Sequence, residues 1–192
     1  MVRNSDILLL GYLFTPAQVG YYRVATSLTS LIRVPVTPLY SASYPELTYL
    51  WQIKDINTLK RILKRLVMTT SIIAITATVT IFIFGKWLIA ITVSNEYLPA
   101  LPVIYWLTIS NALAIISSYG HALLLAMNKA TSSLQALAVG LMGQIIILVI
   151  LAPFMGIIAA GIASVIFYIL WITIVLTTIY RVINPLRTTN KQ

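Results

Sequence analysis

Apolar residues along this chain gather in long uncharged runs that short polar segments separate. Leu66–Phe84 holds 19 residues without a charge, and Leu98–Met127 is uncharged as well. A bilayer core about 30 Å thick is crossed by roughly 20 apolar residues in a helix, and the backbone must satisfy its hydrogen bonds internally there. We therefore interpret both runs as transmembrane helices. Residues 85–93 are apolar but too short to cross, so we expect a bend or a short interfacial helix at the outer surface.

The longest uncharged run, from residue 130 to 180, is too long to be one span. Its 51 residues contain no Lys, Arg, Asp or Glu. A single helix of that length would extend about 75 Å, more than twice the bilayer thickness. Pro153 and Gly156 form the strong helix-breaking site inside the run. The pattern predicts two spans, about 132–152 and 156–180, joined by a tight turn and followed by a tail at 181–192.

The beginning of the chain departs from this regularity. The apolar run 7–14 has only eight residues, less than half of what a span needs. The next run, 20–47, is long enough but carries two arginines and three prolines, and prolines bend helices because they remove hydrogen bonds. We interpret 20–47 as a bent span and 7–14 as a partial one. The expected fold is an all-α membrane protein, a bundle of five full transmembrane helices in a single domain over residues 1–192.

The composition supports a membrane protein and restricts its chemistry. Hydrophobic residues make up 59% of the chain and charged residues 9%, against about 25% charged in soluble domains. The mean hydropathy is +0.94. The chain contains no cysteine, one histidine and four acidic residues. These numbers provide no metal-ligand cluster and no Ser/His/Asp trio, so we predict no metal, no cofactor and no enzyme activity.

The basic residues are sorted between the loops. The net charge of +9 would suggest nucleic acid in a soluble protein, but here one set of alternate loops holds nine basic residues, so we expect no nucleic-acid partner. The opposite loops hold only Lys86, which Glu96 balances. Positive loops face the cytoplasm, which places the C-terminus there too. The nine residues are Lys54, Lys60, Arg61, Lys64, Arg65, Lys129, Arg181, Arg187 and Lys191.

The span 20–47 has one polar face. At 100° per residue, its two arginines and six of its hydroxyl side chains fall within about 100° of one another. Arg33 lies roughly 21 Å from the outer end, near the membrane midplane, where an arginine costs about 2.5–3.5 kcal/mol. Such a residue faces a bundle interior or a watery cavity. The face consists of Arg23, Thr26, Ser30, Arg33, Thr37, Tyr40, Ser41 and Tyr44.

Two interpretations of Arg33 are open. It could pair with Asp6, the acidic residue that we expect at membrane depth, or it could line a cavity. One carboxylate cannot balance two arginines, so we favour the cavity. A cationic, hydroxyl-rich cavity suits phosphate or pyrophosphate together with sugar hydroxyls. The candidate substrate-binding residues are Arg33, Arg23, Thr37, Tyr40 and, from the span 98–127, Asn111.

Two other features are interpreted as helix packing. His121 has no carboxylate in its own span, which favours a hydrogen-bonded packing residue over a proton relay. Small residues at spacings that permit close helix contact follow the Pro153 turn. They are Gly156, Ala159, Ala160, Ala163 and Ser164.

Three stretches of the chain are informative as an ordered set: SDILLLGYLFTPAQVGYYRVATSL, SNEYLPALPVIYWLTISN and LAPFMGIIAAGIAS. In this order they resemble the C-terminal half of polysaccharide flippases, the Wzx or O-antigen transporter type of the MATE/MOP superfamily. The resemblance covers nearly the whole chain. The matching positions are Asp6, Gly11, Val19, Gly20, Tyr22, Ala25, Tyr97, Pro153, Gly156 and residues 159–164.

The resemblance implies a transporter of two lobes, of which this chain would be the second. Residues 7–14 would then end a span whose beginning belongs to a missing N-terminal lobe. The implied activity is the flipping of undecaprenyl-pyrophosphate-linked oligosaccharide, an O-antigen (lipopolysaccharide) or capsule repeat unit, across the bacterial inner membrane. Implied partners are this lipid-linked oligosaccharide, the lipid bilayer, and polysaccharide polymerase and chain-length proteins.

Three alternatives to the flippase are open. A MATE-type cation-coupled drug efflux protein would need carboxylates at membrane depth, which are scarce here. A non-transporting subunit of a polysaccharide assembly complex is a second alternative. A membrane acyltransferase or glycosyltransferase is the third, and the absent site chemistry opposes it.

Overall fold

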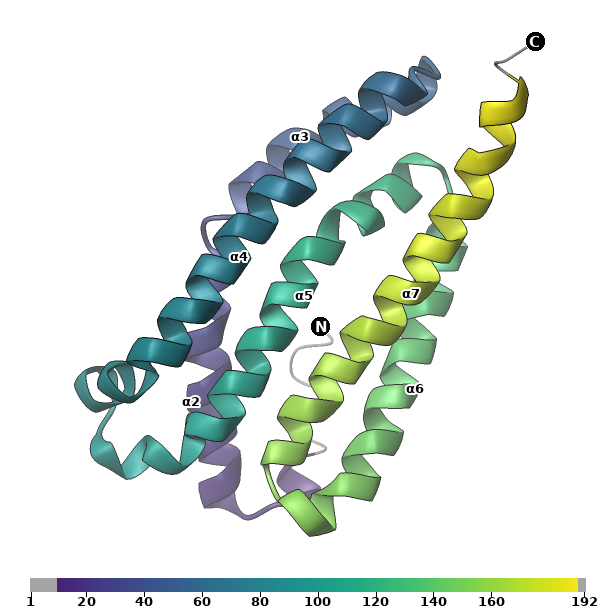
Figure 1. Ribbon diagram of the computed structural model, residues 1–192. Coiled ribbons are helices and arrows are strands. Elements are labelled where there is room, and N and C mark those ends of the chain that lie inside the picture. The colour runs from purple at the N-terminus through teal and green to yellow at the C-terminus, as the bar shows by residue number, and fades with distance from the viewer. Residues whose placement is uncertain (1–9, 190–192) are drawn as a thin grey trace.

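The computed structural model describes residues 10–189, and the side chains up to residue 183. Every regular element in that range is a helix. Residues 10–13 are helical, whereas Asp6 and the first part of the partial span 7–14 lie outside the described residues. The further elements (Figure 1) are α2 (Pro16–Ser30), the 3-10 helix η2 (Leu31–Arg33), α3 (Thr37–Gln52), α4 (Ile56–Thr92), the 3-10 helix η3 (Asn95–Ala100), α5 (Leu101–Ala126), α6 (Ala130–Met155) and α7 (Ile158–Thr189).

Four helices are long and apolar enough to cross a membrane, so the chain is a multi-pass all-α membrane protein, as expected. They are Ile56–Thr92, Asn95–Ala126, Ala130–Met155 and Ile158–Ile183. Two of them are longer than the sequence pattern indicated. The helix α4 continues through residues 85–92, where we expected a separate element, and its last turns change direction (Figure 1). The helix α7 continues to Thr189, through much of the expected tail.

The expected span 20–47 is not one helix. It is divided into α2 and α3, of 15 and 16 residues, with η2 and a turn between them. Pro35 provides no N–H for the hydrogen-bond ladder, and Pro38 lies in the first turn of α3, where a missing N–H is harmless. The prediction of a continuous bent helix is therefore wrong at residues 31–36, and neither half alone has the roughly 20 residues of a span.

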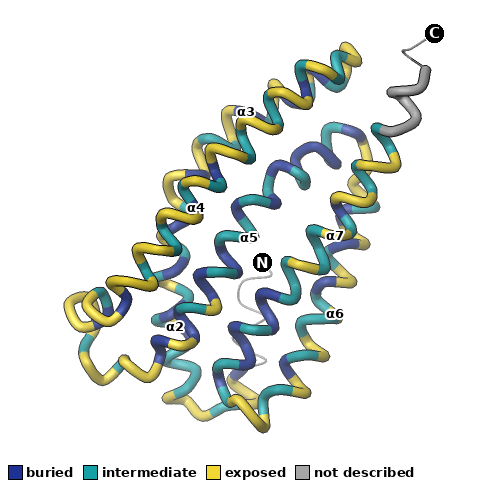
Figure 2. The backbone as a smooth tube through the Cα atoms, in the orientation of Figure 1, coloured by how far each residue is buried: buried dark blue, intermediate teal, exposed yellow. Residues whose placement is uncertain are grey.

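The helix α5 is the centre of the bundle. It packs against α2, α3 and α4 on one side and against α6 and α7 on the other, and it is the most continuously buried helix (Figure 2). The helices α6 and α7 form an antiparallel hairpin. Gly156 ends α6 with a φ of +55°, a left-handed conformation that suits glycine, so the predicted turn after Pro153 is present. Since α2 does not pack closely against α6 or α7, α5 bridges a space between them.

Small residues bring α7 close to its neighbours, as the small-residue spacing predicted. Ala159, Ala160 and Ala163 are all at least 97% buried. A Cβ atom added at Gly161 of α7 would lie 2.6 Å from the Cβ of Trp106 on α5. Without water to drive association, membrane helices depend on this kind of close packing.

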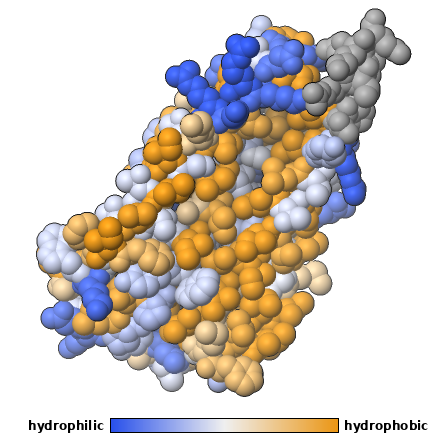
Figure 3. Space-filling view, viewed as in Figure 1, coloured by the Kyte–Doolittle hydropathy of each residue, from blue (hydrophilic) through white to orange (hydrophobic). Residues whose placement is uncertain are grey.

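The loops that carry the excess of basic residues lie together at one end of the bundle, as far as the structure describes them. The α3–α4 loop, the first turns of α4, the α5–α6 turn and the last turns of α7 are all at the top of Figure 1. The same end is hydrophilic in Figure 3, above a broad hydrophobic band. Lys86 and Glu96 belong to the opposite end, with the α6–α7 turn. The helices thus separate the two loop sets as the charge pattern required.

The glycine contact leads to a testable prediction. Gly161→Ala should destabilise the protein by about 1–3 kcal/mol, because its methyl group would force α7 away from Trp106. Gly20→Ala is the matched control: nothing lies within 4 Å of its added Cβ atom, and alanine favours a helix by about 1 kcal/mol over glycine. Unfolding midpoints in detergent micelles measure both changes. Equal midpoints for the two variants would contradict the close α5–α7 contact.

Candidate functional site

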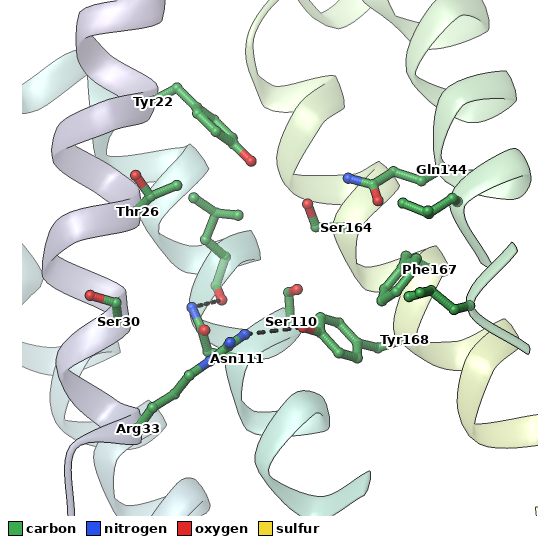
Figure 4. Close-up of a pocket in the computed structure, with 13 residues that line it drawn as sticks. Tyr22, Thr26, Ser30, Arg33, Ser110, Asn111, Gln144, Ser164, Phe167 and Tyr168 are labelled. Atoms are coloured by element: carbon green, nitrogen blue, oxygen red, sulfur yellow. Dashed lines mark hydrogen bonds between the residues drawn. The ribbon is translucent and has the colours of Figure 1, made fainter. Parts of the chain in front are cut away.

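A cavity of about 320 Å³ lies between α2 on one side and α6 and α7 on the other, with α5 behind it (Figure 4). We call it the main cavity. Its described lining mixes hydroxyl, amide and aromatic side chains with a few leucines, and Arg33 is its charged member. The lining residues are Tyr22, Thr26, Ser30, Arg33, Leu107, Ser110, Asn111, Leu137, Leu141, Gln144, Ser164, Phe167 and Tyr168.

Arg33 reaches across this cavity. It is the last residue of η2, and its Nη2 donates a hydrogen bond of 3.1 Å to the hydroxyl of Tyr168 on α7 (Figure 4). Its Nε atom is buried and has no hydrogen-bond partner among the described residues. A guanidinium has five N–H donors in a planar fork that matches carboxylate and phosphate oxygens. Arg33 therefore keeps donor capacity for an anion.

The break between α2 and α3 positions this arginine. Residues 34 and 36 donate their backbone N–H groups to the carbonyl oxygens of Leu31 and Arg33, each at 3.1 Å. The hydroxyl of Thr37 also donates to the carbonyl oxygen of Arg33, at 3.0 Å. These bonds satisfy the backbone polar groups that the proline-rich segment would otherwise leave without partners in an apolar environment. Arg33 is thus held at a helix end beside the cavity.

Several hydroxyl groups of the lining donate their protons to the backbone. Thr26 donates to the carbonyl oxygen of Arg23 at 2.9 Å, and Ser30 donates to that of Ser27 at 2.8 Å. Ser164 donates to the carbonyl oxygen of Ala160 at 2.9 Å. A hydroxyl in this state still offers oxygen lone pairs. This part of the wall therefore accepts hydrogen bonds.

Further hydrogen-bond donors come from α5 and α6. Ser110 and Gln144 have no hydrogen-bond partner among the described residues, and both line the cavity. Asn111 donates its Nδ2 to the carbonyl oxygen of Leu107 at 2.9 Å, which orients its amide (Figure 4). The lining therefore offers both hydrogen-bond donors and acceptors to a sugar, and it offers one cation, Arg33, to an anion.

A smaller side cavity of about 170 Å³ lies on the other side of Arg33. Thr37 and Tyr40 of α3 line it together with Arg33 and residues of α5. The structure thus brings Arg33 and Asn111 into the main cavity, and Arg33, Thr37 and Tyr40 into the side cavity. Arg23 is exposed and lines neither, although it is one residue from Tyr22. The side chains at 22 and 26 are one turn apart and point inward, so position 23 points elsewhere.

Tyr168 is the important cavity residue that sequence reasoning missed. It lies in an uncharged run where a tyrosine is ordinary, and its partner Arg33 is 135 residues away. A weak signal exists, because Ser164 and Tyr168 are four residues apart and so share a helix face. Ser110 was missed in the same way, next to the predicted Asn111.

His121 is outside both cavities. Its Nδ1 lies 2.7 Å from the hydroxyl oxygen of Ser133 on α6, and its ring is next to Trp171 of α7. The expectation of a hydrogen-bonded packing residue is confirmed.

The main cavity has the features of a binding site. Its described lining contains no carboxylate and no histidine. Within residues 10–189, no three His, Cys, Asp or Glu side chains come together as metal ligands would. One cation among hydroxyls and amides is suited to holding an anionic, hydroxylated molecule rather than to acid–base chemistry.

These features define a multi-pass membrane protein with a polar cavity between its helices. The family model described as "Polysaccharide biosynthesis protein" matches residues 1–102, and the chain belongs to this family. The match includes α2, η2 with Arg33, α3 and α4. No curated protein and no solved structure matches the chain.

The bond between Arg33 and Tyr168 can be measured with a double-mutant cycle. Arg33→Met and Tyr168→Phe should show a coupling free energy of about 1.5–3 kcal/mol, because hydrogen bonds to charged groups contribute at that level. Chemical unfolding in micelles provides the four stabilities. The control cycle combines Arg33→Met with Tyr105→Phe, which packs against Phe82 of α4 and should give additive effects. Additivity in both cycles would contradict the bond.

Proposed function

We propose that the chain forms one lobe of a transporter that flips undecaprenyl-pyrophosphate-linked oligosaccharide, an O-antigen or capsule repeat unit, across the bacterial inner membrane. The observation that carries this proposal is Arg33, a cation with unused donors in a polar cavity between apolar helices. Membership of a polysaccharide biosynthesis family supplies the substrate class. The likeness of the sequence to the MATE/MOP flippases supplies the reaction.

The cavity's size supports binding of the headgroup. Small-ligand pockets usually have volumes of about 300–1,000 Å³. The main cavity, at about 320 Å³, is at the lower end of that range. It accommodates the pyrophosphate and the sugar beside it, while the remaining saccharide extends beyond these walls. The prenyl chain stays in the bilayer, where its burial costs nothing.

The broken helix supports a transport role. Discontinuous helices line substrate sites in many transporters, because irregular backbone at membrane depth is tolerated beside a cavity. When a pyrophosphate oxygen replaces the Tyr168 hydroxyl as the partner of Arg33, the link between η2 and α7 is released. Headgroup binding then weakens the connection between η2 and the α6–α7 hairpin. Because of this exchange, the substrate contacts the two states of the lobe differently. A ligand can shift an equilibrium between two states only if it binds them with different affinity.

The charge of the cavity disfavours the drug-efflux alternative. A cationic drug would meet Arg33 and no carboxylate among the described lining residues. The same absence disfavours a transferase, which needs a general base. A saccharide pyrophosphate meets an opposite charge and suitable hydrogen-bonding groups.

The basic end of the bundle faces the cytoplasm in this proposal, and labelling tests it. Asn57 and Asn95 are exposed asparagines at opposite ends, and the chain has no cysteine. Asn95→Cys should react with a membrane-impermeant thiol reagent added to intact cells, and Asn57→Cys should react only after the cells are opened. Mass-tag shifts on gels report the labelling. Reaction of Asn57→Cys in intact cells would reverse the orientation.

The binding role of Arg33 is tested by polysaccharide export. Arg33→Ala should abolish export at a normal membrane level of the protein, because it removes the cavity's cation. Arg33→Lys should retain part of the activity, since it keeps the charge but loses the planar fork. Leu31→Ala is the control, because Leu31 is 61% exposed and faces away from the cavity. Export is measured as surface polysaccharide, and protein level by immunoblot.

A structural role for Arg33 predicts a different pattern. If Arg33 only neutralises Asp6, Arg33→Ala should lower the amount of protein, because a carboxylate then lacks its partner. Asp6→Asn should restore both the amount of protein and export. Export by that double variant would overturn the binding role.

A further inference from the structure

A cavity larger than the main cavity lies at the basic end of the bundle, far from Arg33. Its volume is about 590 Å³, and it is bordered by the first turns of α4 and the last described turns of α7. The helices α4 and α7 do not pack closely against each other, although both contribute to the buried cluster that contains Leu59 and Leu123. The start of α4 and the end of α7 both lie at the top of Figure 1. We call this opening the basic-end cavity.

Two cations flank the mouth of the basic-end cavity. Lys60 comes from α4 and Arg181 from α7, and both are exposed. No carboxylate belongs to its described lining. The two side chains therefore converge from separate helices on one opening, where a single anion could contact both.

The wall near the two cations is mainly apolar. Leu176, Ile179 and Ile183 of α7 line it. Thr177 lines it too, and its hydroxyl donates to the carbonyl oxygen of Ile174. Ile179 and Ile183 also pack against the buried cluster that contains Leu59 and Leu123, so this side of the cavity is fixed by core packing. Leu176 is five residues from Arg181, about 7.5 Å toward the middle of the membrane. The surface thus changes from cationic to apolar over the depth at which a lipid changes from headgroup to acyl chain.

The opening faces the surroundings of the bundle rather than its centre. Leu176 is 58% exposed and Tyr180 is 68% exposed. Tyrosine is enriched at the level of the headgroups, where its ring is apolar and its hydroxyl is hydrated. The cavity is therefore open toward the lipid around the bundle.

We propose that the basic-end cavity binds one anionic glycerophospholipid. Its phosphate lies between Lys60 and Arg181, and one acyl chain lies along Leu176 and Ile179. Basic pockets between transmembrane helices recognise anionic lipid headgroups in this way. Such a lipid joins α4 to α7 where the protein itself leaves them apart. The proposal needs only a bilayer with anionic lipid, so it does not depend on the transport function.

The test compares lipids on the purified full chain in detergent. Native mass spectrometry should show one palmitoyl-oleoyl phosphatidylglycerol retained in preference to the matching phosphatidylcholine, and this lipid should raise the unfolding midpoint. In the double variant Lys60→Gln/Arg181→Gln, affinity for phosphatidylglycerol should fall about 25-fold or more, because each cation contributes roughly a factor of five to ten. The charge-preserving variant Lys60→Arg/Arg181→Lys should bind as the parent does, which excludes misfolding as the cause.

The control removes the same charge from the same end. Lys54→Gln/Lys129→Gln changes two residues outside the cavity lining and should alter the affinity less than twofold. An equal loss in this control would overturn the site in favour of general attraction to a positive surface. Equal retention of phosphatidylcholine would also overturn it. Preferential displacement of phosphatidylglycerol by undecaprenyl phosphate would overturn the assignment to bilayer phospholipid and assign the cavity to a prenyl lipid.

Discussion

The lack of water in the bilayer core is the constraint on which this structure depends. Each backbone group at that depth must be paired inside the protein, and a charged side chain must have a polar surrounding. Regular α-helical pairing stops at residues 31–36, so this segment must meet the rule in another way. Short 3-10 hydrogen bonds and the Thr37 hydroxyl pair with backbone groups of this segment. The side chain of Arg33 lines two cavities. The break between α2 and α3, the arginine and the two cavities therefore depend on one another.

The central helix α5 makes this feature possible. It keeps α2 apart from the α6–α7 hairpin, so that the main cavity has a back wall and two flanks. Close packing through Gly161 and the neighbouring alanines ties α7 firmly to α5. The hydrogen bond from Arg33 to Tyr168 links η2 to α7 across the cavity. The close packing against α5 and the hydrogen bond to Arg33 thus both involve the same helix, α7.

Much of the fold follows from the sequence because apolar length dominates in a membrane. The uncharged runs and the alternating charge of the loops predicted the positions of α4 to α7. The helix-breaking residues Pro153 and Gly156 predicted the turn between α6 and α7. The break near Arg33 was underestimated, because a helical wheel assumes that 100° per residue continues through Pro35. That assumption also grouped Arg23 with Arg33, whereas the structure leaves Arg23 exposed. The role of Tyr168 could not be predicted, because a hydrogen bond between residues 135 positions apart leaves no local pattern in the sequence.

The hydroxyl groups of Thr26, Ser30 and Ser164 have a consequence for the direction in which a ligand fits. Their protons are committed to backbone carbonyl oxygens, so they present only lone pairs to the cavity. Phosphate oxygens, which are acceptors, find no donors in these three groups and are drawn to Arg33. Sugar hydroxyls can donate to the same three groups. If the cavity holds the proposed headgroup, these three groups therefore favour the orientation in which the phosphate contacts Arg33 and the sugar hydroxyls contact Thr26, Ser30 and Ser164.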